Sequence, residues 1–221
     1  MIKFENTDVF NFEGAIRGMR NPLNSWDKSD SEYCTDGGAG LCEECDRRNC
    51  NSYYIGDNDL ALMKRLIKAG SDHRKFMRQI FVSVDITAPL YWWKEFDTYK
   101  VGTVANSCST MHTIHTKEFT LDDFSYEQLS DSGLKVLYQI IAFLNETREW
   151  YISTKSKLYW WDLIQILPTS YNQKRTITLS YENLLSIYDS RRNHKLDEWS
   201  IGFMEWIESL PYAKELIIDR S

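Results

Sequence analysis

The sequence predicts a helix-rich α+β fold, in which a small antiparallel sheet packs against long helices. Several stretches carry apolar residues at helical spacing, whereas only two alternate apolar and polar residues as strands do. Hydrophobic residues make up 43% of the 221 residues and aromatic residues 14%, which argues against disorder. This length suits one sizeable core, so we expect a single domain over residues 1–221 with a cysteine-rich insertion at about 21–54.

The N-terminal part begins with a predicted strand over Lys3–Phe12, followed by a short helix over Glu13–Arg20. Asp57–Gly70 is predicted as a helix, because Asp57 or Asn58 can cap its start and Gly70 can end it. Arg78–Thr87 alternates apolar and polar residues and is rich in β-branched side chains, which predicts a second strand.

The segment after that strand begins with Ala88–Pro89 and continues as an aromatic run, Tyr91–Trp93. Proline at a first helical position suits its fixed φ and missing N–H, so we expect a helix here. A polar loop should follow, whose small side chains and backbone N–H groups are of the kind that grip phosphates. Its candidate residues are Gly102, Thr103, Asn106, Ser107, Ser109 and Thr110.

The C-terminal half is predicted to be helical in four stretches. Apolar residues recur at helical spacing through Ser125–Thr147, and Pro168 closes the next stretch. The stretches are Ser125–Thr147, Leu158–Leu167, Ser180–Tyr188 and Leu196–Leu210.

Four cysteines, Cys34, Cys42, Cys45 and Cys50, lie within seventeen residues at the spacing C-x7-C-x2-C-x4-C. Four thiolates in a glycine-rich loop suit a tetrahedral structural zinc ion in a reducing compartment. Free thiols, disulfides and redox chemistry remain alternatives.

The net charge of −6 gives no general attraction to nucleic acid or to an anionic membrane. A mononucleotide remains possible, because it needs only a local basic pocket. The sequence has no apolar run of about twenty residues and no leader pattern, so we expect a soluble cytoplasmic protein without a membrane or nucleic-acid partner.

The order of elements around His73 resembles the central block of the flavin-dependent thymidylate synthases. Members of that family carry a histidine motif, an edge strand, Ala-Pro, an aromatic helix and then a signature that begins Arg-His-Arg; here His73 lies fifteen residues before Ala88. The resemblance continues at Ala15–Arg17, at Ile166–Pro168 and at Trp199, and covers most of the chain except the cysteine-rich stretch.

The signature itself differs in this chain. Thr98, Tyr99 and Lys100 stand where the family has Arg-His-Arg, so only the last basic charge remains. Each arginine replaced by threonine forfeits a charge-assisted contact of roughly 1.5–3 kcal/mol. The other replacements are Glu95 for a glutamine, Thr103 and Cys108 for serines, Ala105–Asn106 for Asn-Glu, Thr110 for arginine and Met111 for tyrosine.

The resemblance implies an enzyme that binds FAD and a pyrimidine deoxynucleotide such as dUMP between the subunits of a homotetramer. Methylenetetrahydrofolate would supply a one-carbon unit for C5 of the pyrimidine, and NADPH the hydride. It assigns Arg192 to catalysis, His73, Lys100 and Thr103 to the cofactor, and Glu95, Asn106, Cys108 and Arg191 to the substrate.

Other interpretations of these residues remain open. His73 can be a loop histidine, Lys100 an exposed charge at a helix end, and Arg191–Arg192 part of a solvated turn. Cys108 can be a small packed residue or a nucleophile for C6 of a pyrimidine. The chain can also be a relative with another pyrimidine or carbon unit, or a non-catalytic flavin- or nucleotide-binding or zinc-stapled interaction protein.

Overall fold

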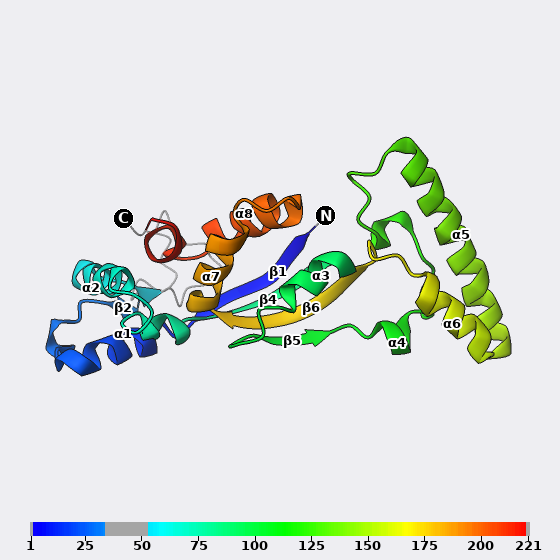
Figure 1. Cartoon of the computed structure of the whole chain (residues 1–221). Helices are drawn as coiled ribbons and strands as arrows, with labels where there is room; N and C mark the ends of the chain where they lie inside the picture. Colours follow the sequence, from blue (N-terminus) through cyan, green and yellow to red (C-terminus); the bar gives the residue numbers. More distant parts are fainter. Residues whose placement is uncertain (1, 34–52, 220–221) are drawn as a thin grey trace, which may run out of the picture. The chain divides into compact units, whose positions relative to one another are not determined.

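The computed structural model describes residues 2–33 and 53–219, and its fold confirms the helix-rich α+β class with a small antiparallel sheet (Figure 1). The strands are β1 (Lys3–Phe10), β2 (Glu32–Tyr33), β3 (Tyr53–Tyr54), β4 (Phe81–Pro89), β5 (Val104–Ser107) and β6 (Asn172–Ser180). The α-helices are α1 (Phe12–Arg20), α2 (Asp57–Lys68), α3 (Leu90–Phe96), α4 (Thr110–Thr113), α5 (Asp131–Thr154), α6 (Lys157–Ile166), α7 (Tyr181–Arg191) and α8 (Met204–Glu208).

Shorter helical turns connect these elements. The 3-10 turns are η1 (Asn21–Leu23), η2 (Trp26–Lys28), η3 (Lys75–Arg78) and η4 (Leu121–Asp123). The π-helices are η5 (Glu198–Phe203) and η6 (Lys214–Ile218).

The main sheet has the strand order β1-β4-β6-β5, which can be followed in Figure 1. Its second strand, β4, buries Val82, Val84, Ile86 and Ala88 completely, the period-two pattern that predicted a strand. β5 pairs antiparallel with β6, with Val104 opposite Thr178, and ends the strand order. β2 and β3 form a separate antiparallel pair.

The chain divides into two compact units. Unit 1 comprises Met1–Thr7, Ser83–Thr178 and Asn193–Met204. Unit 2 comprises Asp8–Val82, Leu179–Arg192 and Glu205–Ser221.

Unit 1 contains a core of stacked aromatic rings. The rings of Trp92 and Trp199 are stacked with their centroids 4.4 Å apart, and Phe96 stacks on Trp92 at 5.2 Å. Trp93 and Phe203 complete this buried cluster. Aromatic rings supply a large buried area at low conformational cost, so the cluster fixes α3 against η5.

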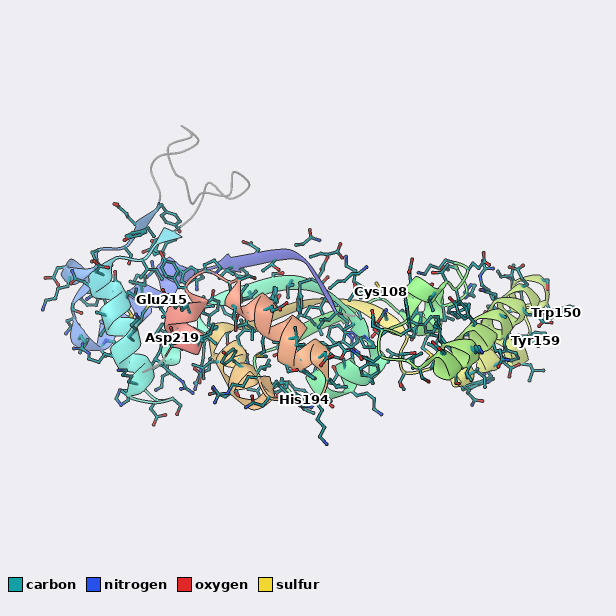
Figure 2. All side chains as sticks on the ribbon, turned by 90° about the horizontal axis from the view of Figure 1, so that it is seen from above. Cys108, Trp150, Tyr159, His194, Glu215 and Asp219 are labelled. Atoms are coloured by element: carbon teal, nitrogen blue, oxygen red, sulfur yellow. The ribbon has the colours of Figure 1, made fainter. Side chains whose placement is uncertain are left out.

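A second core in unit 1 lies beneath the helix pair α5–α6. Leu137, Ile141 and Leu144 of α5 pack with Leu163 of α6. Ser130 caps α5, because its Oγ accepts a hydrogen bond from the N–H of Gly133 at 3.2 Å. Figure 2 shows Trp150 and Tyr159 close together at the far end of this pair, and their rings are stacked at 6.2 Å.

Unit 2 is held by a buried ion pair between α1 and α2. Arg20 Nε lies 2.6 Å from Asp59 Oδ1, and both side chains are at most 4% exposed. Asp59 Oδ2 accepts hydrogen bonds from Ser29 Oγ and Ser31 Oγ at 2.7 and 2.6 Å. Both carboxylate oxygens of Asp59 therefore have hydrogen-bond or ion-pair partners, which a buried ion pair requires.

Three predicted elements need correction. Residues 104–107, which we predicted as part of a polar loop, form strand β5; all four residues are exposed, so no alternating burial pattern marks them. Leu196–Leu210, predicted as an ordinary helix, is helical without a break over residues 197–208, but its first part, η5, is a π-helix and only α8 is an α-helix. Pro89 has ψ 153°, so it caps α3 instead of forming its first residue.

Strand β6 was not predicted from the sequence. Its alternating buried residues, Gln173, Ile177 and Leu179, carry the period-two signal, but the polar residues between them obscure it. The four clustered cysteines, Cys34, Cys42, Cys45 and Cys50, lie outside the described residues.

Candidate functional site

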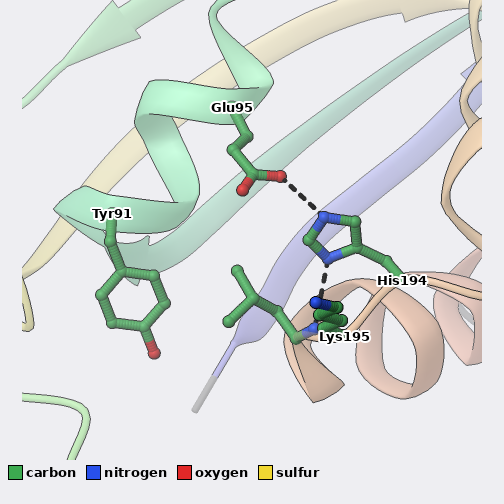
Figure 3. A pocket seen from close by; sticks show the side chains of 5 residues that line it. Tyr91, Glu95, His194 and Lys195 are labelled. Atoms are coloured by element: carbon green, nitrogen blue, oxygen red, sulfur yellow. Dashed lines mark hydrogen bonds and ion pairs between the residues drawn. The ribbon is translucent and has the colours of Figure 1, made fainter.

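The clearest candidate site in unit 1 is a hollow of about 510 Å³ beside helix α3 (Figure 3). Tyr91 and Glu95 are four residues apart, so they lie on the same face of α3, while Trp92, Trp93 and Phe96 are buried. His194, Lys195 and Leu196 line the hollow from the segment that leads to η5.

A histidine and a carboxylate meet in this hollow. His194 Nε2 lies 3.2 Å from Glu95 Oε2, and the N–H of Leu196 donates to His194 Nδ1 at 3.2 Å. Because Nδ1 accepts that hydrogen bond, the ring proton is on Nε2, which donates to Glu95. The backbone therefore fixes the tautomer of His194 and points its N–H at the carboxylate.

Tyr91 is held as a hydrogen-bond donor. Its hydroxyl donates to the carboxylate of Glu198. Burial raises the pKa of Tyr91, and the hydrogen bond to Glu198 and the charges of Glu198 and Glu127 raise the pKa further. The phenol therefore remains protonated at neutral pH, and the hollow combines a phenol, an imidazole and a carboxylate.

Sequence reasoning identified Glu95 but missed His194 as its partner. His194 was visible only as one member of the basic run at Arg191–Lys195. The separation of Glu95 and His194 along the chain leaves no local pattern that would pair them, and only the packing of η5 on α3 brings them together.

Lys100, Thr103, Asn106 and Cys108, which the resemblance assigns to cofactor and substrate, lie between α3 and α4 in unit 1. Lys100 is exposed, and no ion pair is found for its ammonium among the described residues. Gly102 has φ +75°, a conformation that favours glycine, and lets the chain turn into β5. Thr103 Oγ1 is buried without a hydrogen-bond partner in the described part of the chain.

Asn106 lies on β5 and Cys108 directly after it, and both are exposed. The backbone of Cys108 is fixed to β6, because its N–H donates to Lys174 O at 2.9 Å and its carbonyl accepts from Gln173 Nε2 at 2.8 Å. Cys108 also lines a second hollow of about 330 Å³, together with the hydroxyls of Ser109 and Thr110.

The basic residues of the neighbouring strand β6 are engaged in ion pairs. Arg175 Nη1 lies 2.8 Å from Asp97 Oδ1, and its guanidinium lies 4.2 Å from the centre of the Trp93 ring. Lys174 Nζ lies 3.0 Å from Glu5 Oε2 and 3.4 Å from Asp85 Oδ2. Both cations are therefore already paired with carboxylates in unit 1.

The remaining assigned residues belong to unit 2. His73 is exposed in the turn after α2, where its backbone N–H donates to the carbonyl oxygen of Gly70 at 3.0 Å. Arg191 lies in the last turn of α7, and the exposed Arg192 caps that helix. The structure thus places Glu95, Lys100, Thr103, Asn106 and Cys108 in unit 1 and His73, Arg191 and Arg192 in unit 2.

No group of three or more His, Cys, Asp or Glu residues is arranged to hold a metal ion within residues 2–33 and 53–219. The four clustered cysteines lie outside these ranges, so the zinc site stays a prediction. In the same ranges no helix is both long and apolar enough to cross a bilayer.

The described residues thus form a helix-rich α+β protein with two hollows in unit 1, each lined by polar and aromatic side chains. The chain is similar in structure to thymidylate synthase X from Helicobacter pylori, in a crystal structure with FAD and dUMP. That match has a TM-score of 0.67 and 14% sequence identity, and covers 100% of this chain and 99% of the other. A second structure of the Helicobacter pylori flavin-dependent enzyme, complexed with FAD and dUMP, matches with a TM-score of 0.65 at 14% identity, over 99% and 97% of the two chains.

No family model and no curated protein sequence matches the chain. At this low identity the structural likeness shows the fold alone. It confirms, at the level of architecture, the resemblance to the flavin-dependent thymidylate synthases.

Proposed function

We propose that the chain is a divergent flavin-dependent thymidylate synthase-like enzyme that transfers a one-carbon unit to C5 of a pyrimidine deoxynucleotide, dUMP or a relative. The observation that supports this most is the structural likeness over the whole chain to a protein crystallised with FAD and dUMP. The polar segment Lys100–Cys108, which includes the exposed edge strand β5, offers a surface for phosphate and ribose groups.

The residues in unit 1 fit an anionic cofactor or nucleotide by their donor chemistry. Lys100 offers a cation, Asn106 an amide, and Thr103 a buried hydroxyl that lacks a partner among the described residues. Because Lys100 alone stands in place of several arginines, we expect this chain to bind a phosphate group more weakly than the family does. Bound FAD would supply the carrier for the carbon unit, with methylenetetrahydrofolate as its donor and NADPH as the hydride source.

Within this proposal the side chains bind and orient the ligands. Lys100 and Thr103, with His73, contact the cofactor, while Asn106 and Cys108 line the phosphate and ribose. Glu95, held by His194, accepts hydrogen bonds from the nucleotide. Arg192, or its neighbour Arg191, polarises the pyrimidine ring.

The proposal also covers the domain organisation, the cellular location and the oligomeric state of the protein. The chain acts as a single domain with a cysteine-rich insertion that holds structural zinc. It works in the cytoplasm as a homotetramer, with each site built between subunits.

A non-catalytic flavin- or nucleotide-binding protein is the second candidate. It is favoured by the loss of the Arg-His-Arg signature and by Lys174 and Arg175, which are paired with carboxylates beside β5. In this case the fold serves binding or assembly, and the Glu95–His194 pair is structural.

The absorption spectrum of the purified protein, with and without added FAD and dUMP, tests the proposal. We expect flavin bands that co-elute with the protein, and turnover of dUMP when the co-substrates are present. A protein that retains flavin without turnover supports the non-catalytic candidate, and failure to retain FAD contradicts both flavin-based readings.

Arg192→Ala and Arg191→Ala form a matched pair, since both arginines lie at the end of α7. We expect Arg192→Ala to abolish nucleotide-dependent turnover while the fold and assembly stay intact, and Arg191→Ala to weaken nucleotide binding but leave measurable turnover. The reverse result would move the catalytic role to Arg191, and unchanged turnover in both would overturn the assignment.

A further inference from the structure

The hollow beside α3 presents hydrogen-bond acceptors to a ligand, because the imidazole and the phenol that line it already donate to carboxylates. The ring N–H of His194 donates to Glu95 Oε2 at 3.2 Å, and the hydroxyl of Tyr91 donates to Glu198. The second ring nitrogen of His194 accepts from the backbone N–H of Leu196 at 3.2 Å. A ligand edge that enters this hollow therefore needs donors of its own.

The carboxylate of Glu95 is the acceptor that a ligand in this hollow would meet. Its side chain is 35% exposed and lines the hollow. Figure 3 shows one carboxylate oxygen turned to His194 and the other turned away from it. An ionised carboxylate has about four lone-pair sites, so the hydrogen bond from His194 leaves room for further donors. His194 thus orients the carboxylate of Glu95 without saturating it.

Acidic side chains surround Tyr91 in the same hollow. The Glu198 carboxylate accepts the hydroxyl of Tyr91, and the charge of Glu127 also raises the pKa of Tyr91, so both carboxylates act on this group. Lys195 is the cation among the lining residues, and its side chain is exposed to solvent. Negative charge repels a carbonyl oxygen of a ligand and attracts the hydrogens of an amino group. The charge distribution therefore favours the same kind of ligand edge as the hydrogen bonds do.

We infer that this hollow recognises the 4-amino group of a cytosine base, so that the nucleotide bound is a deoxycytidine nucleotide and dUMP is a poorer ligand. The amino group of cytosine offers N–H donors at the corner of the ring, and a Glu or Asp carboxylate can accept from it. Uracil has a carbonyl oxygen at the same position, which would face the carboxylate of Glu95 without a proton between them. The N3–H of uracil lies between two carbonyl oxygens, so a carboxylate that accepts this N–H also meets one of those oxygens.

This inference rests on the proposed function, because it names the base of the nucleotide that the proposed site binds. Glu95 selects the base, and His194 is a positioning residue that acts through Glu95. The affinities for two nucleotides that differ only in the base separate the inference from the proposal on which it rests.

The first experiment measures the dissociation constants of dCMP and dUMP for the full chain by isothermal titration calorimetry in the presence of added FAD. We expect dCMP to bind about 20-fold more tightly than dUMP. Equal or tighter binding of dUMP overturns the inference and leaves the proposed function standing. Binding of neither nucleotide overturns the inference and contradicts the proposed function as well.

Glu95→Gln and Glu146→Gln form a matched pair of variants, since both exchange a carboxylate for an amide of the same size. Glu146 is exposed on α5 and does not line the hollow. We expect Glu95→Gln to reduce the preference for dCMP to about 3-fold or less, because an amide can turn its N–H groups to the uracil oxygen. Glu146→Gln should keep the full preference. A preference that survives Glu95→Gln unchanged overturns the role of Glu95.

His194→Ala tests the positioning role of the imidazole. Loss of the ring N–H leaves the carboxylate of Glu95 without its fixed orientation, so we expect the preference for dCMP over dUMP to fall about 5-fold. A merely structural role would weaken the binding of both nucleotides alike. An unchanged ratio of the two dissociation constants therefore overturns the positioning role.

Discussion

Helix α3, which supplies three rings of the aromatic core of unit 1, and the segment Lys100–Cys108 are neighbours in sequence but differ in burial. Trp92 and Trp199 are fully buried and stacked at 4.4 Å, whereas Lys100, Asn106 and Cys108 are exposed. The core holds α3 by burying its rings, whereas the segment is held mainly by backbone hydrogen bonds to β6. The difference explains how an architecture can persist at 14% identity while the residues expected to contact ligands change.

The same contrast separates structural cations from candidate ligand cations. Arg20, Lys174 and Arg175 are each paired with a carboxylate. Lys100, in the connection between α3 and β5, and Arg192, at the end of α7, are exposed. Substitutions in the first group should therefore change the free energy of unfolding, and those in the second group the affinity for ligands.

The largest effect is expected for Trp92→Ala. Removing this ring leaves a cavity beside Trp199 and Phe96, so we expect the free energy of unfolding of unit 1 to fall by about 4 kcal/mol. Urea unfolding followed by tryptophan fluorescence and circular dichroism measures the loss. A loss below about 1 kcal/mol would show that the aromatic core does not carry the stability assigned to it.

The next largest effect is expected for Asp59→Asn in unit 2. It leaves the buried guanidinium of Arg20 without its counter-ion, so the free energy of unfolding should fall by about 3 kcal/mol. Chemical unfolding of the variant at pH 7 gives the value. Asp57→Asn, an exposed carboxylate on the same helix, is the control and should change little.

The lowered pKa of Asp59 also predicts how the free energy of unfolding depends on pH. Burial raises the pKa of Asp59, but hydrogen bonds from Ser31, Ser29 and Arg20 outweigh it, and the pKa falls below the ordinary value of 3.8. The stabilisation is therefore complete above about pH 5 and lost as the pH falls through the folded-state pKa. Thermal melting between pH 3 and 7 should show less acid destabilisation in Asp59→Asn than in the native chain.

A smaller effect, on affinity alone, is expected for Lys100→Ala. Loss of an exposed phosphate contact should weaken FAD or nucleotide binding about 10-fold, near 1.4 kcal/mol, without changing the unfolding curve. Fluorescence titration with FAD measures the affinity, and Lys94→Ala, another exposed lysine of the α3 region, serves as the control. Equal affinity in both variants would remove Lys100 from the site.

The smallest effect is expected for Cys108→Ser. The side chain is exposed, and its backbone contacts to β6 do not depend on the thiol, so stability should change by less than about 0.5 kcal/mol. Turnover should also persist if Cys108 only lines the substrate. Complete loss of turnover with an intact fold would instead support a nucleophilic thiol.

Much of the architecture was predictable because local patterns dominate there. The predicted helix Asp57–Gly70 corresponds to α2 (Asp57–Lys68), and the predicted strand at Arg78–Thr87 to β4, where alternate residues are buried. β5 was missed because an edge strand with four exposed residues has no apolar period. The roles of the assigned ligand residues stay predictions.

The sequence by itself determined the α+β class, most helix positions and the resemblance to the flavin-dependent thymidylate synthases, because periodicity, caps and motif order are local properties. Only the tertiary structure decided that Glu95 meets His194, that Arg175 is engaged by Asp97, and that Tyr91 donates to Glu198. These outcomes depend on which distant elements pack together. Such packing is set by the burial of the whole chain and is not written in any one segment.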